Sequence, residues 1–274
     1  MKTHLTSALF TLIAFSLGAA QIEEQTPNPD QIRILQIDPT PEPDTVSLVI
    51  QFPKENEVKK GKPINIQMRL EGYPLGVDSD FPRSKEIFND SKGQSVHVFI
   101  DNHPYFSVNE AIIDALDDNE NYYDQTMDVD IPFPLNPGMH VIRAFPVRSY
   151  NESLKGDGCL AARIFYVQNK KEDPSMDIDK PYLIYNEPQG SYDYNPHTPI
   201  MLDFYIANCQ LSRDGYKVRL TIDETAQRIL SDWTPYNIYG LQKGVHTVKL
   251  ELLDPQNVSV PGAFNKIQRT IFVE

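Results

Sequence analysis

Cysteine is scarce in this sequence, which has only two among its 274 residues, Cys159 and Cys209. A small scaffold held by several disulfides is therefore excluded. Long apolar runs are also missing. After the first twenty residues, no segment approaches the roughly 18 consecutive apolar residues that a membrane-spanning helix requires. We therefore expect no membrane span in that part of the chain.

Positive charge is in short supply as well. The chain has 25 lysines and arginines against 38 aspartates and glutamates, and its formal net charge is -13. Such an acidic surface repels phosphate groups. We therefore predict no nucleic-acid partner and no binding to anionic lipid.

The motifs of common catalytic sites are absent from the sequence. It contains no Gly-x-Ser-x-Gly, no His-Glu-x-x-His, no glycine-rich phosphate loop and no Cys-x-x-Cys. We therefore predict that the chain is not an enzyme, and that it carries no cofactor unless an acidic loop binds calcium.

The first twenty residues have the pattern of a cleaved signal peptide. Lys2 precedes a short apolar run that ends in small residues. Residues 1–20 are therefore predicted as a signal peptide, and the chain as exported, either periplasmic or secreted. Residues 21–45 are acidic and rich in proline, which favours an extended spacer. Within this spacer, the apolar patch Ile32–Ile37 could add an edge strand.

The remaining composition favours an all-β fold. The chain has 22 prolines, 14 tyrosines and 13 phenylalanines but one tryptophan, which suits many short strands joined by turns. Alternating apolar residues, as at Val218, Leu220 and Ile222, place one face of a strand in a core. The length after residue 20 exceeds the ~100 residues of one β-sandwich, so we expect two domains.

Four blocks of sequence occur twice in the same order, which indicates a duplicated module. The clearest pairs are Val96–Asp101 with Val218–Asp223, and Leu135–Val141 with Leu241–Thr247. The other blocks are a proline-marked turn with the strand after it, at Phe52-Pro53 and Glu187-Pro188, and a closing apolar strand at Ala162–Val167 and Gln268–Val273.

Several short motifs occur together in the second copy: a Pro-x-Gly opening, a Pro-Ile-x-Leu strand, a strand ending in Ile-Asp, and a Gly-x-His-Thr-Val strand. Together they resemble bacterial Ig-like domains, which occur in tandem on exported and cell-surface proteins. The resemblance implies two tandem immunoglobulin-like antiparallel β-sandwiches, and by itself no activity. The matching residues are Pro188, Gly190, Pro199, Ile200, Ile222, Asp223, Trp233, Pro235, Tyr236, Gly244, His246 and Asp254.

We place the first domain at residues 46–168 and the second at 181–274, joined by a charged linker at 169–180. Such a linker predicts motion between the domains. Only the first copy has long insertions, at 71–94 and 102–127.

A capping box at Ser107–Glu110 in the second insertion predicts a short helix over Ala111–Leu116.

Aromatic side chains in the insertions are candidate binding residues, because exposed aromatics on long loops can hold a protein or a glycan. The alternative is that they fold back over the sheet. The same two alternatives, a sugar platform or a place in the core, apply to Trp233 and Tyr236. The candidates in the insertions are Tyr73, Phe81, Phe88, Tyr122 and Tyr123.

An acidic stretch in the second insertion is a candidate calcium site. Oxygen ligands occupy the first, third, fifth and twelfth places of a calcium loop. Tyr122 takes the sixth place, where the turn needs glycine, so a solvated acidic loop is the alternative. The four candidate ligands are Asp117, Asn119, Asn121 and Asp128.

The histidines do not suggest a zinc site. His140 and His246 are equivalent residues of the two copies and should lie a domain apart. His97 alternates with Val96 and Val98, which predicts that its ring faces solvent.

A disulfide between Cys159 and Cys209 is possible but demands a special arrangement. The two residues are expected at equivalent poles of successive domains, ~40 Å apart in a tandem array. A disulfide needs Cα atoms within ~7 Å, so the domains would have to fold back side by side. Two free thiols and pairing between chains are the alternatives.

These observations favour an exported, non-enzymatic interaction or structural protein that presents two sandwiches to a protein or a cell-surface component. Two alternatives are a glycan-binding module, and the accessory domains of a hydrolase with catalysis in the acidic insertion.

Overall fold

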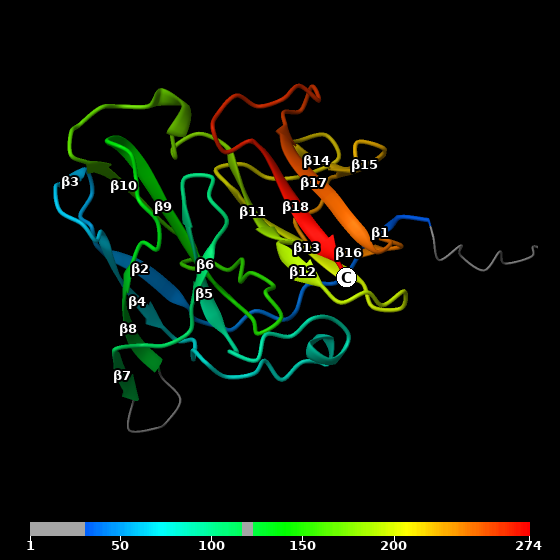
Figure 1. Cartoon of the computed structure of the whole chain (residues 1–274), viewed down its shortest axis with the longest axis horizontal. Coiled ribbons are helices and arrows are strands. Elements are labelled where there is room, and N and C mark those ends of the chain that lie inside the picture. The colour runs from blue at the N-terminus through cyan, green and yellow to red at the C-terminus, as the bar shows by residue number, and fades with distance from the viewer. Residues whose placement is uncertain (1–30, 117–122) are drawn as a thin grey trace, which may run out of the picture.

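The computed structural model describes residues 31–116 and 123–274, whose regular secondary structure is almost entirely β-strand (Figure 1). Two sheets enclose a first core. They are the four-stranded sheet β2 (Ser47–Phe52), β4 (Asn65–Glu71), β8 (Tyr123–Asp130) and β7 (Ile113–Leu116), and the five-stranded sheet β3 (Glu57–Lys59), β10 (Ala161–Val167), β9 (Gly138–Val147), β5 (Ser95–Ile100) and β6 (Phe106–Val108), each in this order.

Two further sheets enclose a second core. They are the four-stranded sheet β1 (Arg33–Gln36), β16 (Tyr236–Tyr239), β13 (Ile200–Ala207) and β11 (Tyr182–Glu187), and the five-stranded sheet β12 (Gly190–Tyr192), β18 (Lys266–Val273), β17 (Gly244–Leu253), β14 (Lys217–Ile222) and β15 (Ala226–Leu230). We call these two units the first and second sheet pair.

Alternation in the sequence explains how each strand meets its core. In β4, Ile66, Met68 and Leu70 are fully buried, while Gln67 and Arg69 between them are partly exposed. Fully burying such an apolar side chain contributes about 1.5–3 kcal/mol. The all-β prediction is confirmed.

The two sheet pairs have the same strand order. The five-stranded sheets match position by position, and in the four-stranded sheets β2-β4-β8 corresponds to β11-β13-β16. One position is filled differently. Where the first pair has β7, supplied by its own insertion, the second pair has β1, supplied by the N-terminal segment.

A repeated hydrogen-bond motif explains one of the repeated sequence blocks. The carboxylate of Asp101 bonds His140 Nδ1 at 2.7 Å and accepts from the Val141 amide at 2.9 Å. In the second copy, Asp223 bonds His246 Nδ1 at 2.6 Å and accepts from the Thr247 amide at 2.8 Å. The Ile-Asp and Gly-x-His signatures therefore join the end of one strand to the start of another.

The helix predicted after Ser107 is wrong. The chain there forms β6, which pairs with β5, and β7, which pairs antiparallel with β8 from Ile113↔Thr126 to Leu116↔Tyr123. An edge strand finds backbone partners on a neighbouring sheet, and this outweighs the local capping signal. The only helical elements of the described residues are two 3₁₀ turns, η1 (Pro82–Lys85) and η2 (Pro174–Met176).

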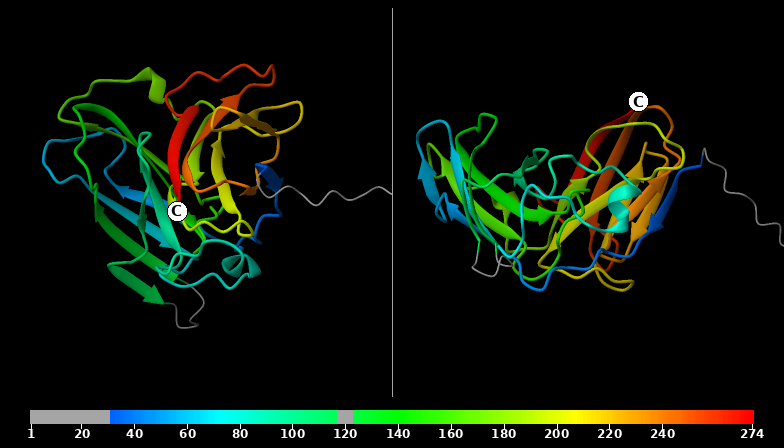
Figure 2. Two further views of the ribbon diagram at one scale, coloured as in Figure 1. Left: turned by 45° about the vertical axis from the view of Figure 1, so that its right-hand side comes forward. Right: turned by 90° about the horizontal axis from the view of Figure 1, so that it is seen from below.

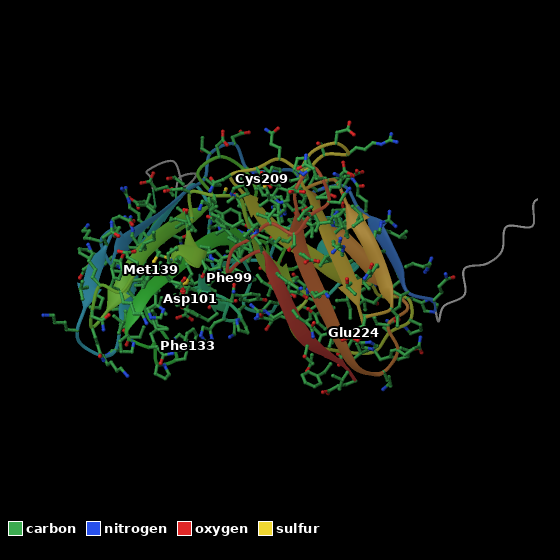
Figure 3. All side chains as sticks on the ribbon, turned by 90° about the horizontal axis from the view of Figure 1, so that it is seen from above. Phe99, Asp101, Phe133, Met139, Cys209 and Glu224 are labelled. Carbon is green, nitrogen blue, oxygen red and sulfur yellow. The ribbon has the colours of Figure 1, made fainter. Side chains whose placement is uncertain are left out.

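A third apolar cluster lies between the two sheet pairs. The outer faces of β5 and β9, with Phe99, Val141 and Phe145, pack against the outer faces of β11 and β13, with Ile184 and Tyr205. Figure 3 shows Phe99 where the two units meet. The motion expected from the linker is therefore opposed by a buried apolar junction.

The same junction corrects the prediction for His97. Its ring is completely buried instead of facing solvent, it stacks on Tyr105 with centroids 3.5 Å apart, and its Nδ1 bonds Asn186 Oδ1 at 2.7 Å. Burial lowers the pKa of His97 to about 3, so the ring is neutral at pH 7.

The apolar patch at Ile32–Ile37 does form an edge strand, β1. It pairs with β16 of the second sheet pair, and the chain then crosses to β2 of the first (Figures 1 and 2). The predicted signal peptide and residues 21–30 lie outside the described residues.

Both cysteines are free thiols, so the possible disulfide is not formed. Each packs in or against a different core, Cys159 in the first and Cys209 against the second, which explains why the two sulfurs do not meet.

We expect both thiols to react slowly with a thiol reagent in the native chain. Burial raises the pKa of Cys159 to about 12 and that of Cys209 to about 11, which keeps both protonated at pH 8. Cys209, which is less buried, should react first, and both should react at once in urea without reductant. Rapid labelling of Cys159 in the folded chain, or unreactive thiols in urea, would contradict this.

Candidate binding groove

The structure separates the predicted aromatic residues. Tyr73 is buried, and its hydroxyl donates to the Val147 carbonyl at 3.3 Å. Phe81 is partly buried against a small cluster of Ile87, Tyr150 and Met201. These two residues follow the alternative in which aromatics cover the sheet. Phe88 does not, because 54% of it is exposed. Tyr122 lies outside the described residues, and Tyr123 begins β8.

A groove of about 270 Å³ contains Phe88 and lies where the first insertion meets the second sheet pair. The insertion contributes one wall, and the chain from the last residue of β12, Tyr192, to the first residue of β13, Ile200, contributes the other. We call it the junction groove. Its lining residues are Lys85, Glu86, Ile87, Phe88, Tyr192, Asp193, Asn195, Thr198, Pro199 and Ile200.

Two aromatic rings form a corner in the groove. The rings of Phe88 and Tyr192 lie edge to face, with centroids 6.4 Å apart and planes at 77°. Ile87, Pro199 and Ile200 are buried and give the groove an apolar floor. An exposed aromatic over an apolar floor is the usual composition of a binding surface.

The rim of the groove carries polar groups that have no partner within the described chain. The side chains of Lys85, Glu86 and Asp193 are exposed and make no hydrogen bond or ion pair there. Asn195 accepts from the His197 amide at 2.9 Å, which leaves its own amide group free to donate. These groups are available to a ligand.

A buried carboxylate lies beneath the groove. Glu187 lines a small cavity that shares Phe88, Tyr192 and Ile200 with the groove. It accepts hydrogen bonds from Tyr105 and Asn151 of the first sheet pair, and from the Tyr192 hydroxyl and the Gln189 amide of the second. Burial raises the pKa of Glu187 to about 7, although these donors oppose the shift.

A second polar cluster crosses the junction nearby. Asp203 is fully buried and accepts from Lys155 Nζ at 2.6 Å and from Asn186 Nδ2 at 2.8 Å. Asn186 uses its oxygen for His97, whose Nδ1 therefore carries the proton. His97 Nε2 is then a buried acceptor without a partner in the described chain.

The candidate calcium ligands are not brought together in the described part of the chain. Asp117, Asn119 and Asn121 lie outside it. Asp128 is exposed on β8 and accepts a hydrogen bond from Asn65. Within residues 31–116 and 123–274, no three His, Cys, Asp or Glu side chains form a group that could hold a metal ion. Calcium binding therefore stays an untested prediction.

Of the two alternatives for Trp233 and Tyr236, a sugar platform or a place in the core, the structure shows the second. The indole nitrogen of Trp233 donates to the Phe204 carbonyl at 3.0 Å, and its ring packs edge-on against Tyr205. Tyr236 is 2% exposed. Neither ring forms an open platform for a sugar.

Glu187 and Tyr192 were missed from the sequence, although a signal for Glu187 was there. In the repeated block, Glu187-Pro188 stands where the first copy has Phe52-Pro53. A carboxylate at a position that is otherwise aromatic departs from the repeat, and such a departure can mark a site.

The solved structures that this chain resembles share little of its sequence. No family model and no curated protein matches the chain, and none of the described helices is long and apolar enough to cross a membrane. Fibronectin(III)-like modules of CbhA from Clostridium thermocellum are 12% identical over 83% of this chain and 94% of that one, with a TM-score of 0.27. A glucan-utilisation protein of Bacteroides ovatus, SGBP-B, solved with a mixed-linkage heptasaccharide, is 13% identical over 90% and 64%, with a TM-score of 0.21. The BSP domain of a biofilm-associated protein is 9% identical over 83% and 51%, with a TM-score of 0.23. Overlaps this low carry no argument about fold or function.

Proposed function

We propose that this chain is an exported, non-enzymatic binding protein of two tandem immunoglobulin-like domains, residues 46–168 and 181–274, whose junction groove takes a segment of a protein partner. The repeated strand order around two separate cores supports the domain assignment. The signal-peptide pattern supports export. The single observation that carries the binding proposal is the exposed Phe88 in edge contact with Tyr192 at the groove.

The chemistry of the groove favours a polypeptide. Its rim carries both signs of charge, from Lys85 and Glu86 on the insertion wall and from Asp193 on the opposite wall. A protein segment offers apolar side chains for the floor, and amides and charges of both signs for the rim.

Photo-cross-linking tests the proposal in the exported protein. A benzophenone amino acid in place of Phe88 should capture one specific partner. The control places the same amino acid at Ile229, which is 47% exposed on β15, at the opposite edge of the five-stranded sheet from the groove strand β12. Equal capture at both positions, or at neither, would contradict the proposal.

Substituting Phe88 should then weaken binding of the captured partner. We expect Phe88→Ala to raise Kd roughly 10- to 100-fold, because an aromatic anchor over an apolar floor contributes about 2 kcal/mol or more to an interface. Ile229→Ala, at the far edge of the sheet, should leave Kd unchanged. Isothermal titration of both variants against the purified partner measures the difference, and an unchanged Kd for Phe88→Ala would place the contact elsewhere.

A glycan is the second candidate, favoured by the same Phe88 ring beside unpaired carboxylates and an unpaired amide. Aromatic faces stack on sugar rings, and carboxylates and amides bond their hydroxyls. Saturable binding of a neutral oligosaccharide that is lost in Phe88→Ala and kept in Ile229→Ala would select this candidate over a protein segment.

A further inference from the structure

The N-terminal segment at residues 31–46, which we call the strap, holds both sheet pairs. Its first part is β1, which adds to β16 from Arg33↔Tyr239 to Gln36↔Tyr236. The Ile37 amide then donates to the Pro235 carbonyl at 3.1 Å. Gly240 lets the strap approach this closely, because a Cβ there would lie 2.4 Å from the Gln31 carbonyl oxygen.

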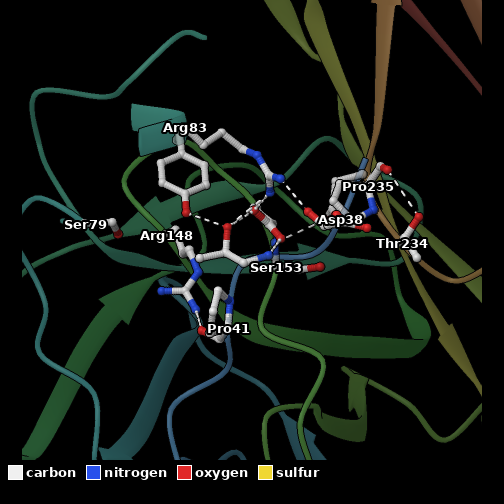
Figure 4. Close-up of polar contacts among 12 residues, drawn as sticks. Asp38, Pro41, Ser79, Arg83, Arg148, Ser153, Thr234 and Pro235 are labelled. Atoms are coloured by element: carbon white, nitrogen blue, oxygen red, sulfur yellow. Dashed lines mark hydrogen bonds and ion pairs between the residues drawn. The ribbon is translucent and has the colours of Figure 1, made fainter. Parts of the chain in front are cut away.

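The strap next crosses to the first sheet pair, where Thr40 is its anchor. The Thr40 amide donates to Glu152 Oε1 at 2.8 Å, and the Thr40 hydroxyl donates to Glu152 Oε2 at 2.7 Å. The Tyr150 hydroxyl lies 2.8 Å from the same Thr40 oxygen. Thr40 and Glu152 are 6% and 3% exposed. Figure 4 shows polar contacts of the strap, among them those of Asp38 with Arg83 and of Pro41 with Arg148.

Arg83 connects this anchor to the groove. Its guanidinium donates to Glu152, to the Thr40 hydroxyl and to the Asp38 carbonyl. Arg83 belongs to η1, no residue of which is buried. The last residue of η1, Lys85, and the three residues after it, up to Phe88, line the groove. Polar contacts to the strap therefore replace the apolar packing that would otherwise hold this turn.

A second route runs parallel to the first. Arg148 donates to the Pro41 carbonyl of the strap, and its guanidinium lies over the Phe81 ring, 4.6 Å from the centroid. Phe81 packs against Ile87 and Tyr150, both of which line the cavity under the groove. Two separate side chains thus link the strap to the wall of the groove that carries Phe88.

We propose that the strap positions the junction groove: Thr40, Glu152 and Arg83 are positioning residues that fix η1 and, through it, the wall from Lys85 to Phe88. The inference rests on the proposed function for the meaning of the groove, but the mechanical link is a property of the free chain. Releasing the strap loosens this wall while both cores stay folded.

Hydrogen exchange of the full-length chain tests the link without a ligand. In Thr40→Val, which keeps the size of the side chain and removes its hydroxyl, we expect the amides of Ser84, Glu86 and Ile87 to exchange roughly tenfold faster or more, because Glu152 loses a buried donor. These amides donate to Phe81 and Arg83 carbonyls within the turn. Strands β9 and β17 should exchange as before.

Thr270→Val, on the exposed face of β18, is the matched control and should change nothing near η1. Arg83→Gln should reproduce the local effect, and combining it with Thr40→Val should add little, because both changes break one cluster. Unchanged exchange at η1 would overturn the inference. A rise of equal size in β9 and β17 would also overturn it, because it would report general destabilisation.

The cross-link at position 88 separates positioning from a merely structural role. Thr40→Val should lower its yield several-fold at a temperature where the variant remains folded, whereas Thr270→Val should not. An unchanged yield would overturn the inference even if exchange at η1 rises. If the parent chain captures no partner, the proposed function fails, and the exchange experiment alone still decides whether the strap holds the groove wall.

Discussion

Replacing Lys155 by methionine is expected to lower the free energy of unfolding by about 3–5 kcal/mol, the largest effect we predict for a single substitution. Lys155 Nζ lies 2.6 Å from Asp203 Oδ1, and the Asp203 side chain has no exposed surface. Without the ammonium group, a carboxylate stays buried with only two neutral hydrogen-bond donors, from Asn186 and the Ser153 amide. An uncompensated buried charge costs several kcal/mol.

Urea denaturation followed by the fluorescence of Trp233, the only tryptophan, measures this loss. The matched control is Lys180→Met, which breaks an ion pair with Asp177 at 3.2 Å in which the lysine is 72% exposed. Exposed pairs contribute at most about 1 kcal/mol.

The double variant Lys155→Met, Asp203→Asn should recover most of the loss, because no charge is left buried. A loss under about 1 kcal/mol in Lys155→Met would mean that the pair does not hold the junction.

The second large effect that we predict is a pH dependence: the contribution of Glu187 to the free energy of unfolding falls as pH rises. Burial raises its pKa to about 7 in the folded chain from the ordinary value of 4.5. Between these values the folded chain binds the proton and the unfolded chain does not, so ∂ΔG/∂pH of unfolding is negative. The stabilisation is fully present below pH 4.5 and is lost as pH rises through about 7. From pH 5 to pH 8 it changes by about 2–3 kcal/mol.

Glu187→Gln removes the titration and keeps one acceptor oxygen. Tyr105 donates to Oε1 of Glu187 and the Tyr192 hydroxyl to Oε2, so one of these two hydroxyls must turn to accept from the new amide group. We expect the variant to lose less stability than the parent chain between pH 5 and pH 8, measured by urea denaturation at both values. Other groups titrate equally in both proteins, so the difference isolates Glu187. Identical pH dependence in the two proteins would contradict the prediction.

Glu251→Gln is an informative control because its expected sign is opposite. Burial raises the pKa of Glu251, but hydrogen bonds from Ser259 and Arg219 outweigh burial and leave that pKa below its ordinary value. Ionised Glu251 therefore stabilises the fold above pH 4.5, and Glu251→Gln should be less stable than the parent chain at pH 8.

Local sequence patterns were enough to predict the strands that form each core. The alternation at Val218, Leu220 and Ile222 placed them in the second core, because one buried face leaves a period of two in any sequence. The repeated Ile-Asp and Gly-x-His blocks predicted a duplicated module, and the strand order of the two sheet pairs is in fact the same.

Local sequence patterns gave wrong predictions where both faces of a sheet are buried. His97 has the alternation of a solvent-facing residue, but the outer face of its sheet is covered by the other sheet pair, which leaves no trace in a period of two. The segment after Ser107 has a valid capping box, yet two sheet edges offer it partners that are distant in sequence. The sequence was enough to name Phe88 as a candidate binding residue, but not to predict the groove that surrounds it.

The sequence by itself determined that this chain is all-β and predicted a repeated module, because periodicity, turn residues and repeated blocks can be recognised without knowing which residues meet in space. Only the tertiary structure decided how the copies meet. The junction groove, the burial of Glu187 and Asp203, and the course of the strap depend on side chains from different parts of the chain. Thr40 and Glu152 are 112 residues apart, and Tyr105 and Glu187 are 82 apart. The proline-rich composition of the strap predicts only that this segment is extended. Which residues it contacts depends on the surfaces of the two sheet pairs that it crosses.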